Sequence, residues 1–192
     1  VDLCIVNTCT VTAESDLKSR KIIRQLARRY PEAGIFVMGC YATRAPQELA
    51  ALPRVVQILQ DKAELPQWLA QLGLANPPEG ISSFGSRHRA FVKIQDGCRQ
   101  GCSYCTIPLV RPVLRSRPIE QVVEEVQRLT ARGYGEIVLT GIHLGHYGLD
   151  LPTPRVNLAQ VVDRLLGVAG AFRLRLSSLE AVELDGELVR LM

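Results

Sequence analysis

Three cysteines within eight residues, Cys98, Cys102 and Cys105, are the feature of this sequence that points most directly to chemistry. Thiolate sulfur is a soft ligand, so such spacing favours an iron–sulfur cluster or zinc. Structural zinc usually takes four ligands from two separated pairs, and His88, ten residues upstream, could complete a Cys3His site. Three thiolates on a four-iron cluster would instead leave one iron open, as an enzyme rather than an electron carrier requires. The spacing therefore predicts an open iron–sulfur site, with zinc as the alternative.

The other cysteines are Cys4, Cys9 and Cys40, in a chain of 192 residues that is large enough to fold without disulfide bonds. Cys9 and Cys40 each follow a short apolar run, residues 3–6 and 35–38, that predicts a buried strand. Because the carboxyl ends of parallel strands share one edge of a sheet, these two cysteines could face the same crevice. Cys4 lies inside the first run, and we interpret it as a core residue because free cysteine packs as a small hydrophobe.

Alternating strands and helices are predicted around Cys9 and Cys40 and would position them. Helices are expected at residues 13–30, 46–51 and 63–72, and a third strand at 55–59. We place an apolar stripe on the first helix, formed by Leu17, Ile22, Ile23, Leu26 and Ala27. Strand–helix alternation with short loops predicts an α/β fold, with a small Rossmann-like parallel sheet covered by helices.

A segment with the composition of a linker follows the predicted N-terminal strands and helices. Residues 75–90 are rich in Pro, Gly and Ser, so we predict an N-terminal domain of residues 1–74 and a second domain of residues 91–192. The second domain has expected strands at 91–95, 136–140 and 172–176, and expected helices at 118–132, at 157–167 with Asn157 as its cap, and from Leu184 onward. This order predicts a (β/α) barrel, truncated because a full barrel takes about 250 residues.

The composition is that of a globular protein, with 47% hydrophobic and 22% charged residues and no apolar run of bilayer-spanning length. Between Arg87 and Arg117 the chain carries seven basic residues against one acid, Asp96. This excess fits contact with phosphates. On charge alone, however, a solvated surface with some ion pairs is the favoured interpretation, because local imbalance of this size is common.

The triplet, with Tyr104 directly before its last cysteine, resembles the signature of radical S-adenosylmethionine enzymes. The resemblance implies that Cys98, Cys102 and Cys105 hold a [4Fe–4S] cluster whose open iron binds the amino and carboxylate groups of S-adenosylmethionine. It also implies a partial or complete (β/α) barrel with the cluster loop after its first strand. The expected cosubstrate contacts at strand ends are Tyr104, Thr140, Gly141 and Glu180.

Flanking segments are similar to one family within this class, the methylthiotransferases. The similar segments are residues 6–12 (VNTCTVT), 39–42 (GCYA), 93–98 (KIQDGC) and 104–108 (YCTIP). In that family an N-terminal domain holds a second [4Fe–4S] cluster through three cysteines. The resemblance implies that Cys9 and Cys40 are two of these ligands and that the third lies upstream of Val1.

Residues 139–148 (LTGIHLGHYG) are similar to the branch that methylthiolates C2 of N6-threonylcarbamoyladenosine in tRNA, next to the anticodon. The resemblance implies tRNA as partner, an electron donor such as flavodoxin or ferredoxin, and a monomer in the cytoplasm. His143 and His146 are interpreted as loop residues near cosubstrate or substrate, since their spacing does not demand a metal. Arg111, Arg115 and Arg117 could hold the tRNA backbone or form ion pairs around the cluster loop.

Two alternatives of different kinds stay open. One is a methylthiotransferase that acts on another tRNA adenosine or on a ribosomal-protein aspartate. The other is a non-catalytic iron–sulfur or zinc module, which would bind no S-adenosylmethionine. Binding of the cosubstrate separates the second alternative from the enzyme.

Overall fold

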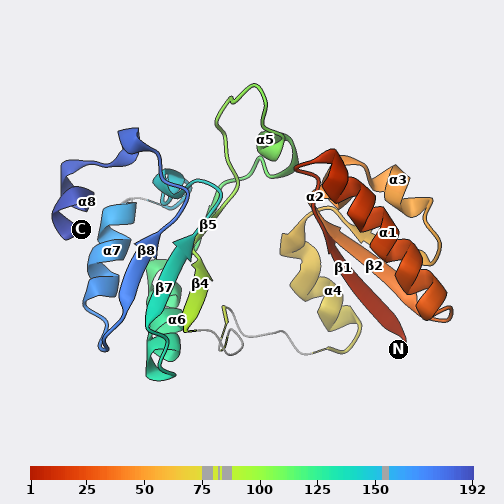
Figure 1. Ribbon diagram of the computed structural model, residues 1–192, viewed down its shortest axis with the longest axis horizontal. Helices are drawn as coiled ribbons and strands as arrows, with labels where there is room; N and C mark the ends of the chain where they lie inside the picture. The colour runs from red at the N-terminus through yellow and green to blue at the C-terminus, as the bar shows by residue number, and fades with distance from the viewer. Residues whose placement is uncertain (75–79, 82, 84–87, 153–155) are drawn as a thin grey trace. The chain divides into compact units, whose positions relative to one another are not determined.

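The structure is a computed structural model that describes the chain except residues 75–79, 82, 84–87 and 153–155. Packing divides the chain into two compact units: Val1–Pro77 with Gly101–Val110, and Pro78–Gln100 with Arg111–Met192 (Figure 1). The expected linker at 75–90 falls largely outside the described residues, so the domain boundaries drawn from the sequence stay predictions. The sequence did not indicate that residues 101–110, which carry Cys102 and Cys105, would pack with the first unit.

The first unit contains a parallel sheet of three strands in the order β1-β2-β3. The strands are β1 (Leu3–Thr8), β2 (Gly34–Gly39) and β3 (Val55–Leu59). Its helices are α1 (Ala13–Arg29), α2 (Cys40–Arg44), α3 (Pro46–Ala50), the short 3-10 helix η1 (Lys62–Glu64), α4 (Leu65–Gln71) and α5 (Ile107–Val110). The predicted α/β fold with an N-terminal parallel sheet is confirmed; α2 and α5 were not expected.

The buried face of α1 differs from the predicted apolar stripe. Ile23 is fully buried, but Leu17 is 59% and Ile22 47% exposed, so their assignment to the core was wrong. The buried positions follow the 3.6-residue period through Ile23, and this face includes a polar residue, Asp16. Asp16 is buried because its carboxylate pairs with the Arg44 guanidinium at 2.7 Å, which compensates its loss of hydration.

The second unit contains a parallel sheet in the order β4-β7-β8, with β4 (Arg89–Lys93), β7 (Glu136–Thr140) and β8 (Arg173–Leu176). Helix α6 (Ile119–Ala131) connects the first pair and α7 (Leu158–Leu166) the second. The remaining elements are η2 (Leu144–His146), η3 (Ala181–Glu183), α8 (Gly186–Leu191) and an antiparallel hairpin of β5 (Gln95–Asp96) with β6 (Arg115–Ser116). The repeat β-α-β-α-β is that of a partial (β/α) barrel, as predicted.

The strand expected at 91–95 is displaced. β4 begins at Arg89 and ends at Lys93, and Gln95 and Asp96 pair with β6 instead. The apolar run misled the prediction because Ile94 is fully buried although it lies between the two strands. The displacement matters because it moves Gln95 out of β4 and into the β5–β6 hairpin at the base of the cluster loop.

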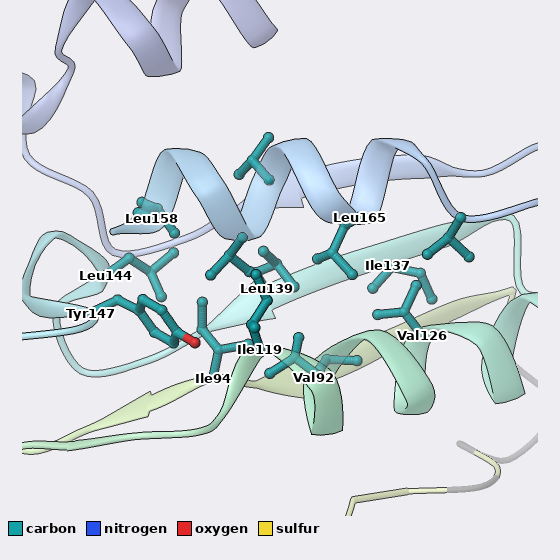
Figure 2. Close-up of a cluster of buried hydrophobic side chains, with 14 of the residues drawn as sticks. Val92, Ile94, Ile119, Val126, Ile137, Leu139, Leu144, Tyr147, Leu158 and Leu165 are labelled. Carbon is teal, nitrogen blue, oxygen red and sulfur yellow. The ribbon is translucent and has the colours of Figure 1, made fainter. Parts of the chain in front are cut away.

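The core of the second unit lies where α6 and α7 pack against the sheet (Figure 2). Val92, Ile137, Leu139 and Leu165 are fully buried there, and burying each such side chain contributes about 1.5–3 kcal/mol. The Asn157 side chain caps α7 by accepting the Gln160 N–H at 2.9 Å, as predicted. In the part of the chain that the structure describes, no helix is long and apolar enough to cross a membrane.

Candidate iron–sulfur and cosubstrate site

The three parallel strands of the second unit have their carboxyl ends at the same side of the sheet. Lys93 pairs with Thr140, and Leu139 with Leu176, so the carboxyl ends of β4, β7 and β8 lie at one edge of the sheet. The loops that follow carry Cys98, residues 141–146 and residues 177–183. In barrels of this kind the site forms at this edge. Thr140 ends β7, Gly141 follows it directly, and Glu180 precedes η3.

Gln95 joins two of these loops and was not recognised from the sequence. Its side chain, 1% exposed, donates from Nε2 to the carbonyls of Asp96 (2.9 Å) and Gly97 (2.7 Å). Its Oε1 accepts the backbone N–H groups of Ile142 and His143, both at 3.0 Å. One amide thus ties the segment before the cysteine triplet to the loop after β7.

A glycine sets the path into the triplet. Gly97 has φ +81°, and a Cβ there would lie 2.0 Å from the carbonyl oxygen of Val113, so only glycine fits. The next N–H, that of Cys98, donates to the Arg111 carbonyl at 3.1 Å. The Cys98 thiol is buried, and its Sγ accepts the N–H of Gln100 at 3.3 Å. These backbone contacts hold Cys98 at the base of the loop.

Ion pairs surround the base of this loop. Asp96 binds Lys93 at 2.5 Å and Arg111 at 2.8 Å; burial alone would raise the pKa of Asp96, but hydrogen bonds and charges from Lys93 and Arg111 lower it to about 2. Arg117 pairs at 2.5 Å with Glu125, a carboxylate that is almost fully buried. For Arg111 and Arg117 the structure supports ion pairing around the loop over contact with phosphate.

Two histidines lie next to Cys98. Ligand atoms of Cys98, His143 and His146 lie within 4.8 Å of one another. The imidazole rings stack with centroids 4.1 Å apart, and Nε2 of buried His143 contacts the Glu183 carboxylate. Burial, followed by the proximity of His143, lowers the pKa of His146, which favours its neutral form. The sequence interpretation placed both histidines in a functional loop but missed their proximity to Cys98, which lies 45 residues before His143 and 48 before His146.

His88 lies at the other edge of this sheet. It directly precedes β4, and its carbonyl accepts the N–H groups of Gly135 and Glu136 at the start of β7. A strand of this length places the imidazole roughly 16 Å from the carboxyl edge. His88 is therefore badly placed to complete a zinc site with Cys98, and the structure argues against the Cys3His alternative.

Cys102 and Cys105 belong to the first unit. The Cys105 N–H donates to the Cys102 carbonyl at 3.1 Å, which forms a tight turn ahead of α5. Cys102 is exposed, Cys105 half-buried, and Tyr104 88% exposed. None of the thiols of Cys98, Cys102 and Cys105 is in a disulfide. Thiolate sulfur is the donor type that iron–sulfur clusters take from proteins.

Cys9 and Cys40 lie at the carboxyl edge of the first sheet. Thr8 pairs with Gly39 in register, and each cysteine directly follows one of these residues. Gly39 has φ +105°, and a Cβ there would lie 2.3 Å from the Thr8 carbonyl oxygen, so glycine permits this close approach. Cys4 is half-buried and packs against the core of the first unit, in agreement with its predicted core role.

Comparison with known proteins agrees with this geometry. Residues 92–166 match the radical SAM superfamily, and residues 1–60 match the uncharacterized protein family UPF0004. The chain is 38% identical over 209 residues to the threonylcarbamoyladenosine tRNA methylthiotransferase MtaB of Bacillus subtilis (strain 168), covering 100% of this chain and 46% of that protein. The protein of the same name from Chlamydia pneumoniae is 36% identical, with 98% and 44% covered. The ribosomal protein uS12 methylthiotransferase RimO of Geobacter sulfurreducens is 33% identical, with 91% and 43% covered.

Residues 92–166 thus combine the sequence of the radical SAM superfamily with the fold of a partial (β/α) barrel. Relatives named methylthiotransferases match along the whole of this chain, so the chain is similar to that family within the superfamily. The chain spans about half the length of the curated relatives it matches.

Proposed function

We propose that this chain is the part of a tRNA methylthiotransferase that carries its iron–sulfur chemistry. The reaction would place a methylthio group on C2 of N6-threonylcarbamoyladenosine beside the anticodon. The observation that carries the proposal is the set of three thiols, Cys98, Cys102 and Cys105, whose first member is fixed at the carboxyl edge of a partial (β/α) barrel. Relatives named for this tRNA reaction support the choice of substrate.

The proposed reaction needs iron–sulfur clusters and a bound cosubstrate, and this chain has candidate residues for both. Cys98, Cys102 and Cys105 would hold a [4Fe–4S] cluster, and Cys9 with Cys40 would hold part of a second one. A cluster held by the first set would supply the electron for reductive cleavage of bound S-adenosylmethionine. The expected cosubstrate contacts are Tyr104, Thr140, Gly141 and Glu180.

The protein's own contribution is to position these groups and to limit access of water. Gln95 holds the loop after β7 against the segment before Cys98 through four hydrogen bonds. Gly141 supports the same arrangement, because a Cβ there would lie 2.9 Å from the Gln95 Oε1. The proposal includes tRNA as partner, a flavodoxin or ferredoxin as electron donor, a monomeric state and a cytoplasmic location.

The test compares three substrates under anaerobic conditions with S-adenosylmethionine and a reductant. They are tRNA bearing N6-threonylcarbamoyladenosine, tRNA bearing a different N6-modified adenosine, and ribosomal protein uS12. Mass spectrometry should find 5′-deoxyadenosine together with a methylthiolated nucleoside from the first substrate. Cys102→Ser should abolish both products, while Cys4→Ser should retain them. Methylthiolation of uS12 instead would refute the tRNA assignment, and absence of 5′-deoxyadenosine would refute the reaction class.

A further inference from the structure

We propose that Cys98, His143 and His146 bind a single divalent transition-metal ion, naturally zinc, when the chain carries no iron–sulfur cluster. The three side chains come from two loops that the register of β4 and β7 brings to one edge of the sheet. Their ligand atoms lie within 4.8 Å of one another, with Cys98 and His143 buried and His146 half-buried. This site lies entirely within the second unit.

The donor set suits zinc. Thiolate and imidazole are its usual protein ligands, and three protein ligands with water in the fourth position form a standard open zinc site. Tetrahedral zinc would bring the sulfur and nitrogen atoms to about 3.3–3.6 Å from one another. No two of these atoms therefore have to move closer by more than about 1.2–1.5 Å from the 4.8 Å limit, which side-chain rotation can supply.

An unsatisfied nitrogen gives independent support. Nδ1 of His146 is buried and has no hydrogen-bond partner. A buried polar atom without a partner costs about 1–3 kcal/mol, so native structures normally satisfy it. A metal bound at Nδ1 of the neutral imidazole would remove this deficit.

Glu183 is positioned to orient the second histidine, His143, for metal binding. Its carboxylate contacts Nε2 of His143, which leaves Nδ1 of that ring for the metal. Histidine ligands commonly donate their second ring N–H to a carboxylate, which fixes the ring and raises its basicity. Glu183 is held in place because its other oxygen accepts the backbone N–H of Glu180 at 3.0 Å.

The zinc site and the proposed cluster would compete for the Cys98 thiol. The proposed function assigns the same thiol to the [4Fe–4S] cluster, so one thiol cannot serve both. A bound zinc ion would protect Cys98 before cluster assembly and would have to leave when the cluster is inserted. The zinc site does not depend on the proposed function, because it concerns the cluster-free chain.

The experiment measures alkylation of each cysteine in the cluster-free chain with and without one equivalent of zinc, read by peptide mass spectrometry. Zinc should slow modification of Cys98 in the wild-type chain. His146→Gln should remove this protection, while His88→Gln, at the opposite edge of the sheet, should keep it. Glu183→Gln should weaken zinc binding about 10–100-fold. The other cysteines report zinc bound elsewhere, since the histidine substitutions should leave their protection unchanged.

Cobalt provides a second measurement that does not depend on access to a buried thiol. Cobalt bound to thiolate and imidazole gives charge-transfer and ligand-field absorption, and the wild-type spectrum should contain a component that both His146→Gln and Glu183→Gln weaken. Circular dichroism confirms that the variants fold. The proposal is overturned if Cys98 is equally reactive with and without zinc, or if protection and spectrum survive in both variants. Either result leaves the proposed enzyme reaction untouched, because that reaction is tested by its products.

Discussion

Replacement of Gln95 by alanine tests whether one buried amide positions the cluster loop. The substitution removes four hydrogen bonds, of which those to the Gly97 carbonyl and from the His143 N–H are buried. Each buried group left unpaired costs about 1–3 kcal/mol. The two together give an expected loss of about 2–6 kcal/mol in the stability of this edge of the second unit.

Hydrogen exchange read by mass spectrometry is the direct assay. The N–H groups of Ile142 and His143 should exchange at least about 30-fold faster in Gln95→Ala, since 1.4 kcal/mol corresponds to a factor of ten. Gln95→Glu is the matched variant, because it retains oxygen acceptors for these two N–H groups and loses only donation to the Asp96 and Gly97 carbonyls. It should therefore leave peptide 141–146 more protected than alanine does, while peptide 95–100 loses protection in both variants.

The single tryptophan supplies a control. Trp68 lies in α4 of the first unit, so its fluorescence in the folded chain should be unchanged by substitution of Gln95. Unchanged exchange at Ile142 and His143 in the alanine variant would refute the positioning role. Equal loss of protection across the first unit would show general destabilisation instead.

Three further predictions concern the surroundings of the loop. Glu125→Ala should destabilise the chain by about 3–5 kcal/mol, measured by urea unfolding, because it leaves Arg117 without its buried partner; a change below 1 kcal/mol would contradict this role. The pKa of Asp96 is lowered from 3.8 to about 2, so its stabilising contribution is complete above pH 4 and is lost as the pH falls toward 2. Asp96→Asn should flatten acid unfolding in that window, and an unchanged profile would contradict the assignment. Gly97→Ala should reduce iron incorporated on reconstitution, while Gly101→Ala, whose Cβ would meet nothing within 4 Å, should match wild type; equal iron in both variants would disprove the steric requirement.

Much of the fold follows from patterns in the sequence. The apolar runs of β1, β2 and β7 and the caps and periodicity of α6 and α7 are local signals, and their elements formed where expected. The helices α2 and α5 are too short to show a helical period. β4 was misplaced because burial of Ile94 extends the apolar run past the end of the strand.

The candidate site was predictable only where its residues are close in sequence. Spacing alone was enough to select Cys98, Cys102 and Cys105 as soft metal ligands. The contact of Cys98 with His143 and His146 arises from the register of β4 against β7, which spacing does not encode. The role of Gln95 was hidden for a related reason, because a buried amide is recognised by its partners and two of them lie almost 50 residues away.

The most direct test of the central claim is electron paramagnetic resonance of the anaerobically reconstituted and reduced chain, with and without S-adenosylmethionine. The account predicts a [4Fe–4S] signal with a component that changes when the cosubstrate is added, and the loss of that component in Cys102→Ala. A signal that ignores S-adenosylmethionine, or a chain that takes up zinc and no cluster under these conditions, would contradict the assignment of Cys98, Cys102 and Cys105 to an open iron–sulfur site.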